Sequence, residues 1–396
     1  MRRFIAFLLC AVLLCGCGAT ATEPTQAANP DSITIDRNFV LVTPKNSNIA
    51  VTESARCLLT TFDYKLKLPK LKIVNDDPGS NAIVFQVDET MESGSYKVEL
   101  KGTSIYMTAE NPYVLLLTTR RLRQMLLDNK AGTVVTKEMC QQLTGKEDMT
   151  NLPFRFLSQN ILFKNIEGGN TVPDRQPRFK ALMYEYCPDI LAVQEHSVDW
   201  SGFIKAEFGS TFTRIDQQGL AFYFRTDRYE VLQNGGFYLS PTPNIKSQFE
   251  GDSGPRSCIW VIAKDKFTDT TILFINCHPD WNNDTQRALQ VEVIFEVMGE
   301  KMDQYPTIFC GDFNTQPDGP IYPRITQEFK DPYKEAEVNL SEIDYTSHGF
   351  GEHSNFIDYS FYSDMFKPTQ YRIINDMYNG HVSDHYGTYT DFILAK

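Results

Sequence analysis

The chain has 396 residues, 42% of them hydrophobic, and a formal net charge of −12. This length exceeds one ordinary hydrophobic core and favours two domains. A chain this acidic gains little from counterion release on nucleic acid, which argues against a non-specific nucleic-acid-binding protein without excluding a nuclease.

The first 17 residues read as an export signal. Two arginines precede an apolar stretch from Phe4 to Leu14, which is too short to span a bilayer. The segment Leu14-Cys15-Gly16-Cys17 is similar to a bacterial lipobox, which implies that Cys17 is lipidated. We therefore expect an exported protein, lipid-anchored in a bacterial cell envelope; an ordinary cleaved signal is the alternative. Residues 18–32, rich in Ala, Thr, Pro and Gln, predict a flexible tether.

Residues 33–145 predict a small α/β accessory domain. Helical spacing is expected around residues 55–62 and over 112–127, the second helix with Asn111 as N-cap. Strand-like runs occupy 33–42, 71–74, 82–87 and 96–107, the last broken at Lys101-Gly102 as in a hairpin. The region has no histidine, whereas all six histidines lie at 196 or beyond. We therefore expect the chemistry in the second domain, over 152–396.

Apolar, strand-like runs in the second domain end in polar side chains. These side chains are Asn160, Glu195, His278 and the pair Asp312 and Asn314. Residues two apart on an extended backbone point the same way, so that pair can reach one phosphate or one water. A carboxylate inside a hydrophobic strand is costly unless paired, so we expect Asp358 to pair with His385.

The polar residues form an ordered set of short motifs: Asn160, Gln194-Glu195, Asn276-x-His278-x-Asp280, Gly311-Asp312-x-Asn314, Ile357-Asp358-Tyr359 and Ser383-Asp384-His385. This set closely resembles the endonuclease/exonuclease/phosphatase superfamily, the DNase I-like Mg²⁺-dependent phosphoesterases. The resemblance implies an α/β fold, a four-layer sandwich of two mixed β-sheets flanked by helices, with the motifs meeting where strands end. We expect one covering helix over 284–302, with Leu289, Val293 and Val297 inward, and a loop at 281–283 at the mouth of the site.

The resemblance also implies a metal site. Glu195 is the expected first ligand of Mg²⁺, with Mn²⁺ as an alternative, and Asn160 and Asp384 lie nearby, because hard cations prefer oxygen ligands. Leu162 stands where some abasic-site nucleases carry a further acidic ligand, which puts a second metal in doubt.

The catalytic roles follow from the same resemblance. Asp312, helped by Asn314, orients or deprotonates the attacking water, and Asp358 orients His385. His278 and His385 flank the phosphate, and whether an aspartate or a histidine is the general base stays open. Arg256 and Arg287 are the candidate phosphate contacts.

Residues 33–145 resemble, more loosely, the small α/β domain that precedes β-hexosaminidase-type barrels in glycoside hydrolases. That resemblance implies scaffolding or glycan contact, and a structural spacer is the alternative. The sequence leaves open whether Cys57 and Cys140 pair, and no obligate protein partner is inferred.

We therefore predict an exported Mg²⁺-dependent phosphoesterase that hydrolyses a phosphodiester or phosphomonoester. The alternatives are an extracellular nuclease and a catalytically silent, glycan-binding surface lipoprotein. The sequence does not select among nucleic acid, phospholipid, inositol phosphate and sugar phosphate as substrate.

Overall fold

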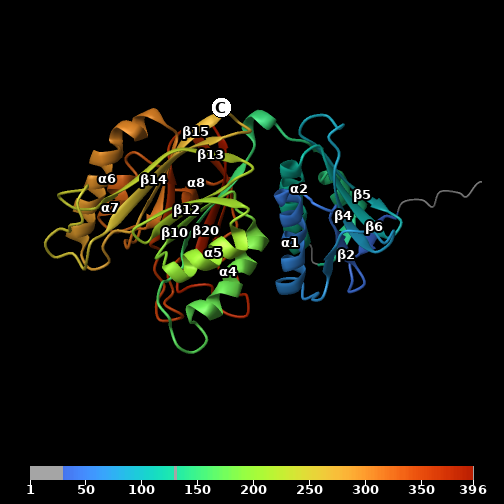
Figure 1. Ribbon diagram of the computed structural model, residues 1–396, viewed down its shortest axis with the longest axis horizontal. Coiled ribbons are helices and arrows are strands. Elements are labelled where there is room, and N and C mark those ends of the chain that lie inside the picture. The colour runs from blue at the N-terminus through green and yellow to red at the C-terminus, as the bar shows by residue number, and fades with distance from the viewer. Residues whose placement is uncertain (1–29, 129–131, 396) are drawn as a thin grey trace, which may run out of the picture.

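The computed structural model describes residues 30–128 and 132–395. The export signal, Cys17 and residues 18–29 of the expected tether lie outside the described residues. Figure 1 shows two bodies side by side, and the helices of the N-terminal part face the C-terminal part. No helix in the described ranges is long and apolar enough to cross a membrane.

The N-terminal part contains a six-stranded sheet with strand order β3-β2-β4-β6-β5-β8 and a two-stranded pair, β1 with β7. Its strands are β1 (Ser32–Thr34), β2 (Val40–Val42), β3 (Lys72–Val74), β4 (Ala82–Val87), β5 (Ser95–Lys101), β6 (Ser104–Ala109), β7 (Val134–Thr136) and β8 (Gly145–Lys146). Its helices are α1 (Ile49–Tyr64), α2 (Pro112–Asp128) and α3 (Lys137–Gln142), followed by the short 3₁₀ turn η1 (Met149–Asn151).

Local sequence explains these elements, with one exception. The predicted Asn111 cap is present: its Oδ1 accepts from Tyr113 N at 3.0 Å and Val114 N at 2.9 Å at the start of α2. The single strand predicted over 33–42 is wrong. Asp36 accepts the N–H of Asn38 (2.9 Å) through its side chain, and the resulting turn separates β1 from β2.

The C-terminal part is a sandwich of two mixed sheets. The seven-stranded sheet has the order β11-β12-β10-β9-β20-β19-β17, and the five-stranded sheet β13-β14-β15-β16-β18. The first sheet contains β9 (Phe154–Asn160), β10 (Ile190–Gln194), β11 (Phe212–Gln217), β12 (Leu220–Arg225), β17 (Val338–Asn339), β19 (Phe366–Ile374) and β20 (Gly387–Leu394). The second contains β13 (Tyr229–Tyr238), β14 (Ser257–Asp265), β15 (Thr270–Cys277), β16 (Thr307–Asp312) and β18 (Asp358–Tyr362).

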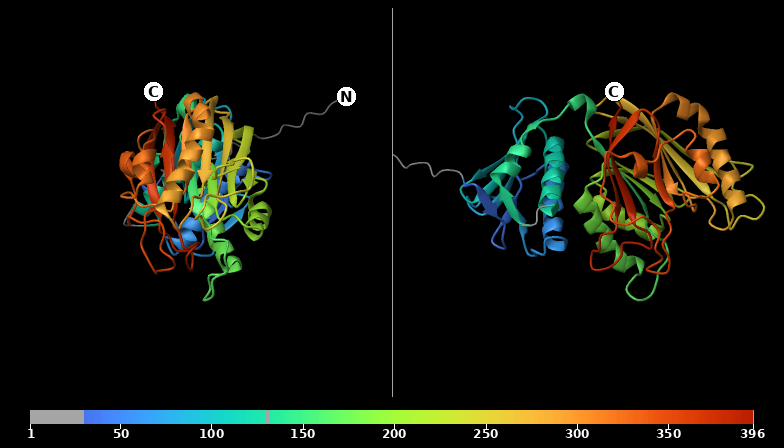
Figure 2. Two further views of the ribbon diagram at one scale, coloured as in Figure 1. Left: turned by 90° about the vertical axis from the view of Figure 1, so that its left-hand side faces the viewer. Right: turned by 180° about the vertical axis from the view of Figure 1, so that it is seen from behind.

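Helices cover the outer faces of the sandwich (Figures 1 and 2). They are α4 (Val172–Tyr186) and α5 (Val198–Phe208) on the seven-stranded sheet, and α6 (Asp284–Gln304), α7 (Ile321–Ile325) and α8 (Pro332–Glu335) in the remainder of this part. The core between the sheets is built from alternate strand residues that include Phe156, Ala192, Phe222, Phe274 and Ile308. The predicted four-layer α/β sandwich is confirmed.

The inward face of α6 differs from the prediction. Val293 is buried, but Leu289 is 43% and Val297 39% exposed. The buried stripe instead includes Val291, Ile294 and Met298. Both faces carry apolar residues, so the packing against the sheet, rather than the helical period, selects which one is buried.

Strand register gathers the motif residues at one edge. β9 and β10 are parallel with Asn160 opposite Gln194, and β16 and β18 are antiparallel with Asp312 opposite Asp358. Asn276 of β15 ties the sheets together, because its Nδ2 donates to Val193 O at 3.0 Å. A Cβ on Gly311 would lie 2.1 Å from the carbonyl oxygen of the parallel strand, so only glycine fits directly before Asp312.

Buried charges join the N-terminal part to the sandwich. Arg120 of α2 donates to both carboxylate oxygens of Asp189 at 3.0 and 3.1 Å, and Glu53 of α1 pairs with Arg225. All six cysteines of the described residues are free, including Cys57 and Cys140. The thiol of Cys57 instead donates to Glu185 O (3.3 Å) across this junction.

Candidate active site

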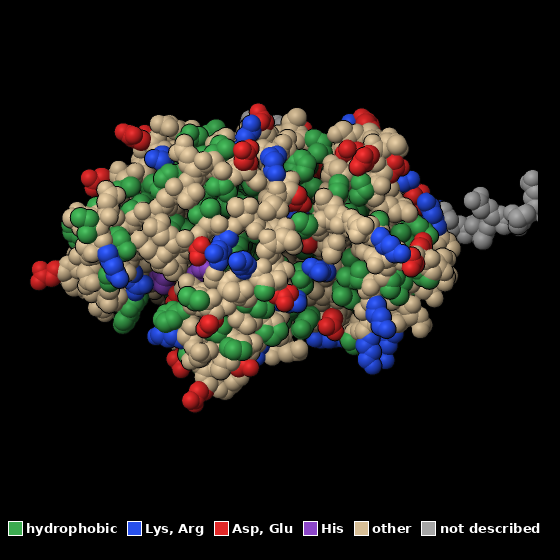
Figure 3. Space-filling view, in the orientation of Figure 1, with side chains coloured by type: hydrophobic (Ala, Val, Ile, Leu, Met, Phe, Trp, Pro, Cys, Tyr) green, Lys and Arg blue, Asp and Glu red, His purple; other side chains and the backbone are tan. Residues whose placement is uncertain are grey.

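A cavity of about 540 Å³ opens where the strands of the two sheets end. Its lining combines carboxylates, histidines, cations and two aromatic rings: Glu195, Asp312, Asp384, His278, His385, Lys164, Arg256, Asn314, Phe163 and Trp281 are among its residues. Figure 3 shows histidine side chains inside a notch in this face of the molecule. Trp281, in the predicted mouth loop, is 63% exposed.

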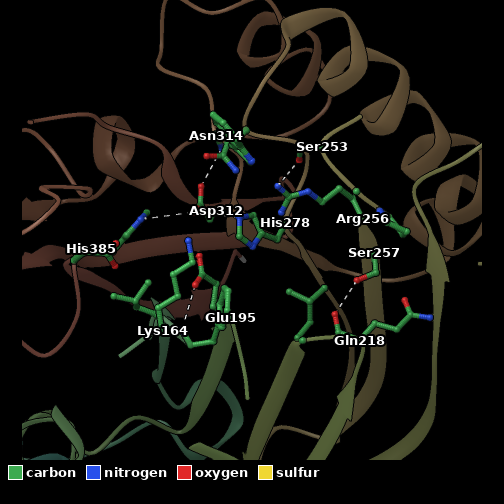
Figure 4. A pocket seen from close by; sticks show the side chains of 18 residues that line it. Lys164, Glu195, Gln218, Ser253, Arg256, Ser257, His278, Asp312, Asn314 and His385 are labelled. Atoms are coloured by element: carbon green, nitrogen blue, oxygen red, sulfur yellow. Dashed lines mark hydrogen bonds and ion pairs between the residues drawn. The ribbon is translucent and has the colours of Figure 1, made fainter. Parts of the chain in front are cut away.

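Asp312 is the centre of the site. Its Oδ2 accepts from Asn160 Nδ2 at 3.0 Å and lies 3.5 Å from His278 Nε2 and 3.8 Å from His385 Nε2. Its Oδ1 accepts the backbone N–H of Asn314 at 3.0 Å. Burial raises the pKa of Asp312, but the two histidines and these hydrogen bonds outweigh burial and lower it. The carboxylate is therefore ionised and held in one orientation beside the cavity (Figure 4).

Glu195 lies at the end of β10 on a strained backbone, with φ at +57°. Its Oε1 accepts from Asn160 Nδ2 at 3.3 Å, and its Oε2 accepts from the N–H of Phe163 at 3.2 Å. Within 4.0 Å, no lysine, arginine or histidine of the described residues pairs with it. Its carboxylate therefore faces the cavity without a direct ion pair to a described cation.

This donor set fits a hard divalent cation. Glu195 and Asp384 line the cavity, Asn160 contacts Glu195, and all three offer oxygen ligands, which Mg²⁺ and Mn²⁺ prefer. Asn160 directs its amide nitrogen at both carboxylates, so it must turn about its last side-chain bond to present oxygen to a metal. Asp312, Asp358 and His385 also have ligand atoms within 4.8 Å of one another. The Asp358–His385 hydrogen bond already engages two of these three residues, which favours Glu195 as the main ligand.

Asp358 and His385 form the predicted pair. His385 Nδ1 donates to Asp358 Oδ2 at 2.9 Å, and both side chains are buried. Burial alone would lower the pKa of His385, but Asp358 and, more weakly, Asp312 raise it to about 10. His385 is therefore an imidazolium at neutral pH, with Nε2 directed toward Asp312 and Ser347 Oγ (3.3 Å).

His278 has the opposite electrostatic character. Burial lowers the pKa of His278, and the neighbouring Asp312 only partly offsets this. The pKa values of the two histidines beside Asp312 thus shift in opposite directions, downward for His278 and upward for His385. This pairing provides a proton acceptor and a proton donor in one site.

The remaining predicted residues separate into two groups. Asn314, Asp384 and Arg256 line the cavity, with Arg256 Nε 3.6 Å from Asp280 Oδ2. Arg287 does not line it: its guanidinium donates to Asp280 O at 3.0 Å and pairs with Asp284. The predicted phosphate contact at Arg287 is therefore corrected to support of the loop that precedes α6.

Two cationic residues at the site were not predicted from the sequence. Lys164 lines the cavity although it belongs to no motif. Arg175 of α4, fully buried, donates to the carbonyl oxygens of Ile161, Leu162 and Lys164 and so holds the loop that follows β9. A lysine in a loop and an arginine in a helix give no distinctive spacing, so sequence offered no signal for either.

The sequence matches the Endonuclease/Exonuclease/phosphatase family over residues 158–385. With the two-sheet sandwich and this cavity, the match shows that the chain belongs to that family, whose members hydrolyse phosphoester bonds. None of the curated proteins matched the sequence.

Several solved structures share the fold. An endonuclease/exonuclease/phosphatase from Bacteroides vulgatus has 24% identity and a TM-score of 0.58, covering 62% of this chain and 100% of that chain. A mannosyl-6-phosphatase from Bacteroides thetaiotaomicron has 24% identity and a TM-score of 0.55, covering 60% and 99%. A functionally unknown conserved protein from Enterococcus faecalis has 22% identity and a TM-score of 0.57, covering 61% and 100%.

Proposed function

We propose that this protein is an exported, divalent-metal-dependent phosphoesterase. The observation that carries the proposal is the environment of Asp312, whose carboxylate lies 3.5 Å from His278 and 3.8 Å from His385 beside the cavity that also contains Glu195. Mg²⁺ is the metal we propose, with Mn²⁺ as an alternative, held by Glu195 with Asn160 and Asp384. When bound, it would neutralise charge on the phosphoryl oxygens.

The residues of the chain supply the rest of the reaction. Asp312 orients a water molecule, and the proton of that water passes to Asp312 or to His278 as a bond forms between its oxygen and phosphorus. The bond from phosphorus to the ester oxygen breaks, and His385 donates its Nε2 proton to the leaving oxygen. Asp358 keeps His385 protonated and oriented by its 2.9 Å hydrogen bond.

For the substrate, we propose a small phosphorylated carbohydrate. The cavity of about 540 Å³ has the size of a small-molecule site, and two exposed aromatic rings, Phe163 and Trp281, line it. The net charge of −12 disfavours a polyanionic nucleic acid. A structural neighbour is a mannosyl-6-phosphatase, which is consistent with a substrate of this class.

We further propose that residues 33–145 and 152–396 are separate domains, because each has its own hydrophobic core. The first domain would then provide scaffolding or glycan contact beside the membrane, to which Cys17 anchors the chain. A Cys17 anchor would keep the catalytic domain outside the cytoplasm.

A substrate panel tests the proposal. The purified full-length protein, in detergent, would be incubated with Mg²⁺ and sugar phosphates, inositol phosphates, sphingomyelin, single-stranded DNA and bis-p-nitrophenyl phosphate. We expect phosphate release from a sugar phosphate at the highest kcat/KM. Preferential cleavage of DNA would overturn the substrate proposal, and no hydrolysis of any compound would overturn the proposed function.

A further inference from the structure

Lys164 places an ammonium group in the active-site cavity. It lines the cavity together with Glu195, Asp312 and His385. Figure 4 shows its side chain rising beside Glu195, with the amine directed toward Asp312 and His278. Among the described residues, no carboxylate pairs with it within 4.0 Å. The amine of Lys164 therefore makes no direct ion pair with a described carboxylate and is available to a bound anion.

The backbone that carries Lys164 is held rigidly. Arg175 donates to Leu162 O at 2.8 Å and to Lys164 O at 2.7 Å, and Trp200 Nε1 donates to Leu162 O at 3.1 Å. Leu162 N donates to Asn160 Oδ1 at 3.0 Å, and Leu162 has a φ of +52°. Hydrogen bonds from Arg175 and Trp200, and one to Asn160, therefore fix the backbone from which the Lys164 side chain extends into the cavity.

Arg256 approaches the same point from the other side. In Figure 4, Lys164 and Arg256 reach toward His278 from opposite directions. The guanidinium of Arg256 is partly committed, since it donates to Ser253 Oγ at 3.1 Å and lies 3.6 Å from Asp280. Among the described residues, no side chain makes a hydrogen bond or ion pair with the Lys164 amine, so this amine is the less committed of the two cations.

We propose that Lys164 binds a non-bridging oxygen of the phosphoryl group, opposite Arg256, and thereby favours phosphomonoesters over phosphodiesters. This inference rests on the proposed function. A phosphomonoester is largely a dianion at pH 8, whereas a phosphodiester is a monoanion, and an unpaired ammonium stabilises the dianion more strongly. Neutralising Lys164 should therefore harm monoester hydrolysis and phosphate binding selectively.

The test uses the full-length protein with three substitutions: Lys164→Met, Lys164→Arg and, as a matched control, Lys205→Met. Lys205 is exposed on α5 and lies outside the cavity. Binding of inorganic phosphate would be measured by calorimetry with Mg²⁺ at pH 8, after thermal melts confirm folding. The values of kcat/KM would be compared for p-nitrophenyl phosphate and bis-p-nitrophenyl phosphate.

We expect Lys164→Met to weaken phosphate binding at least about tenfold and to reduce monoester kcat/KM roughly tenfold more than diester kcat/KM. Lys164→Arg should retain most of the phosphate binding and most of the monoester kcat/KM. Lys205→Met should behave as wild type. Unchanged phosphate binding in Lys164→Met would overturn the assignment, and equal losses for both substrates would overturn the preference. If wild type hydrolyses neither compound, the proposed function fails, while phosphate binding still decides whether Lys164 is an anion ligand.

Discussion

His385 donates its Nδ1–H to Asp358 over 2.9 Å, and Asp358 is itself paired in register with Asp312 on the adjacent strand. The acid that orients the imidazolium and the acid proposed to orient the water are therefore positioned by one pair of strands. A substitution of Asp358 or Asp312 should change the environment of the other acid, because His385 lies between the two.

The first prediction is that Asp358 and His385 act as one unit. His385→Ala and Asp358→Asn should each lower kcat by roughly a hundredfold or more, because a misoriented or neutral imidazole is a poor proton donor. The double substitution should cost little more than the worse single one. The measurement is turnover of one small phosphoester at saturating Mg²⁺, after thermal melts confirm folding. Losses that multiply in the double variant would show that the residues act independently.

The second prediction concerns the metal. Glu195→Gln should lower activity by roughly a hundredfold or more and raise the Mg²⁺ concentration needed for half-maximal rate, since the amide removes the charge that attracts a hard cation. Asp199→Asn is a suitable control because Asp199 lies on α5 and does not line the cavity. A Mg²⁺ titration unchanged from wild type would remove Glu195 from the metal site.

The third prediction concerns the charged junction between the two parts of the chain. Burial raises the pKa of Asp189, but Arg120, Arg228 and Arg225 outweigh burial and lower it to about 2. Because the folded pKa lies below the ordinary value, the stabilisation is fully present above about pH 4 and is lost as the pH falls toward 2. This shift corresponds to about 2 kcal/mol of pH-dependent stability.

Asp189→Asn should therefore lower the free energy of unfolding by about 3–5 kcal/mol at pH 7, because it removes the carboxylate that pairs with buried Arg120. The difference from wild type should shrink between pH 4 and pH 2 in urea unfolding experiments. Asp269→Asn, at an exposed aspartate paired with Lys264, should unfold like wild type. If the difference in the free energy of unfolding between wild type and Asp189→Asn stays constant down to pH 2, the stabilisation by Asp189 is not electrostatic.

The fourth prediction tests anchoring. If Cys17 is lipidated, Cys17→Ser should move the protein from the washed membrane fraction to the soluble exported fraction, since the described residues offer no helix able to span a membrane. Cys140→Ser serves as a control for loss of a cysteine, because Cys140 lies in the N-terminal part as a free, buried thiol. Retention of Cys17→Ser in membranes would refute the lipobox interpretation.

Sequence patterns were sufficient to predict which polar residues lie at the ends of strands. Asn160 and Asp312 each end an apolar strand, and the alternation of strands and turns predicts where each chain segment delivers its polar side chain. The Asp358–His385 contact was also predictable, because a buried acid needs a partner and the chain has few histidines. These inferences depend on local chemistry and on residue order alone.

Other features depend on packing between distant segments, which local patterns do not determine. Arg287 has the composition of a phosphate ligand but turns to Asp280 and Asp284 because it is buried at the start of α6. Lys164 lines the cavity from a loop whose backbone is held by Arg175, eleven residues later, through the carbonyl oxygen of Lys164. The pairing of Arg120 with Asp189, which joins the two parts, likewise has no signature in either segment.

The most direct test of a metal-dependent phosphoesterase centred on Asp312 is the rate of phosphate release from a sugar phosphate. Purified wild type and Asp312→Asn would be measured with Mg²⁺, after chelation by EDTA, and after Mg²⁺ is restored. We predict that chelation abolishes wild-type activity, that Mg²⁺ restores it, and that Asp312→Asn loses at least about a hundredfold in kcat with an unchanged thermal melt. Phosphate release that persists in EDTA, or an Asp312→Asn variant as fast as wild type, would contradict this account.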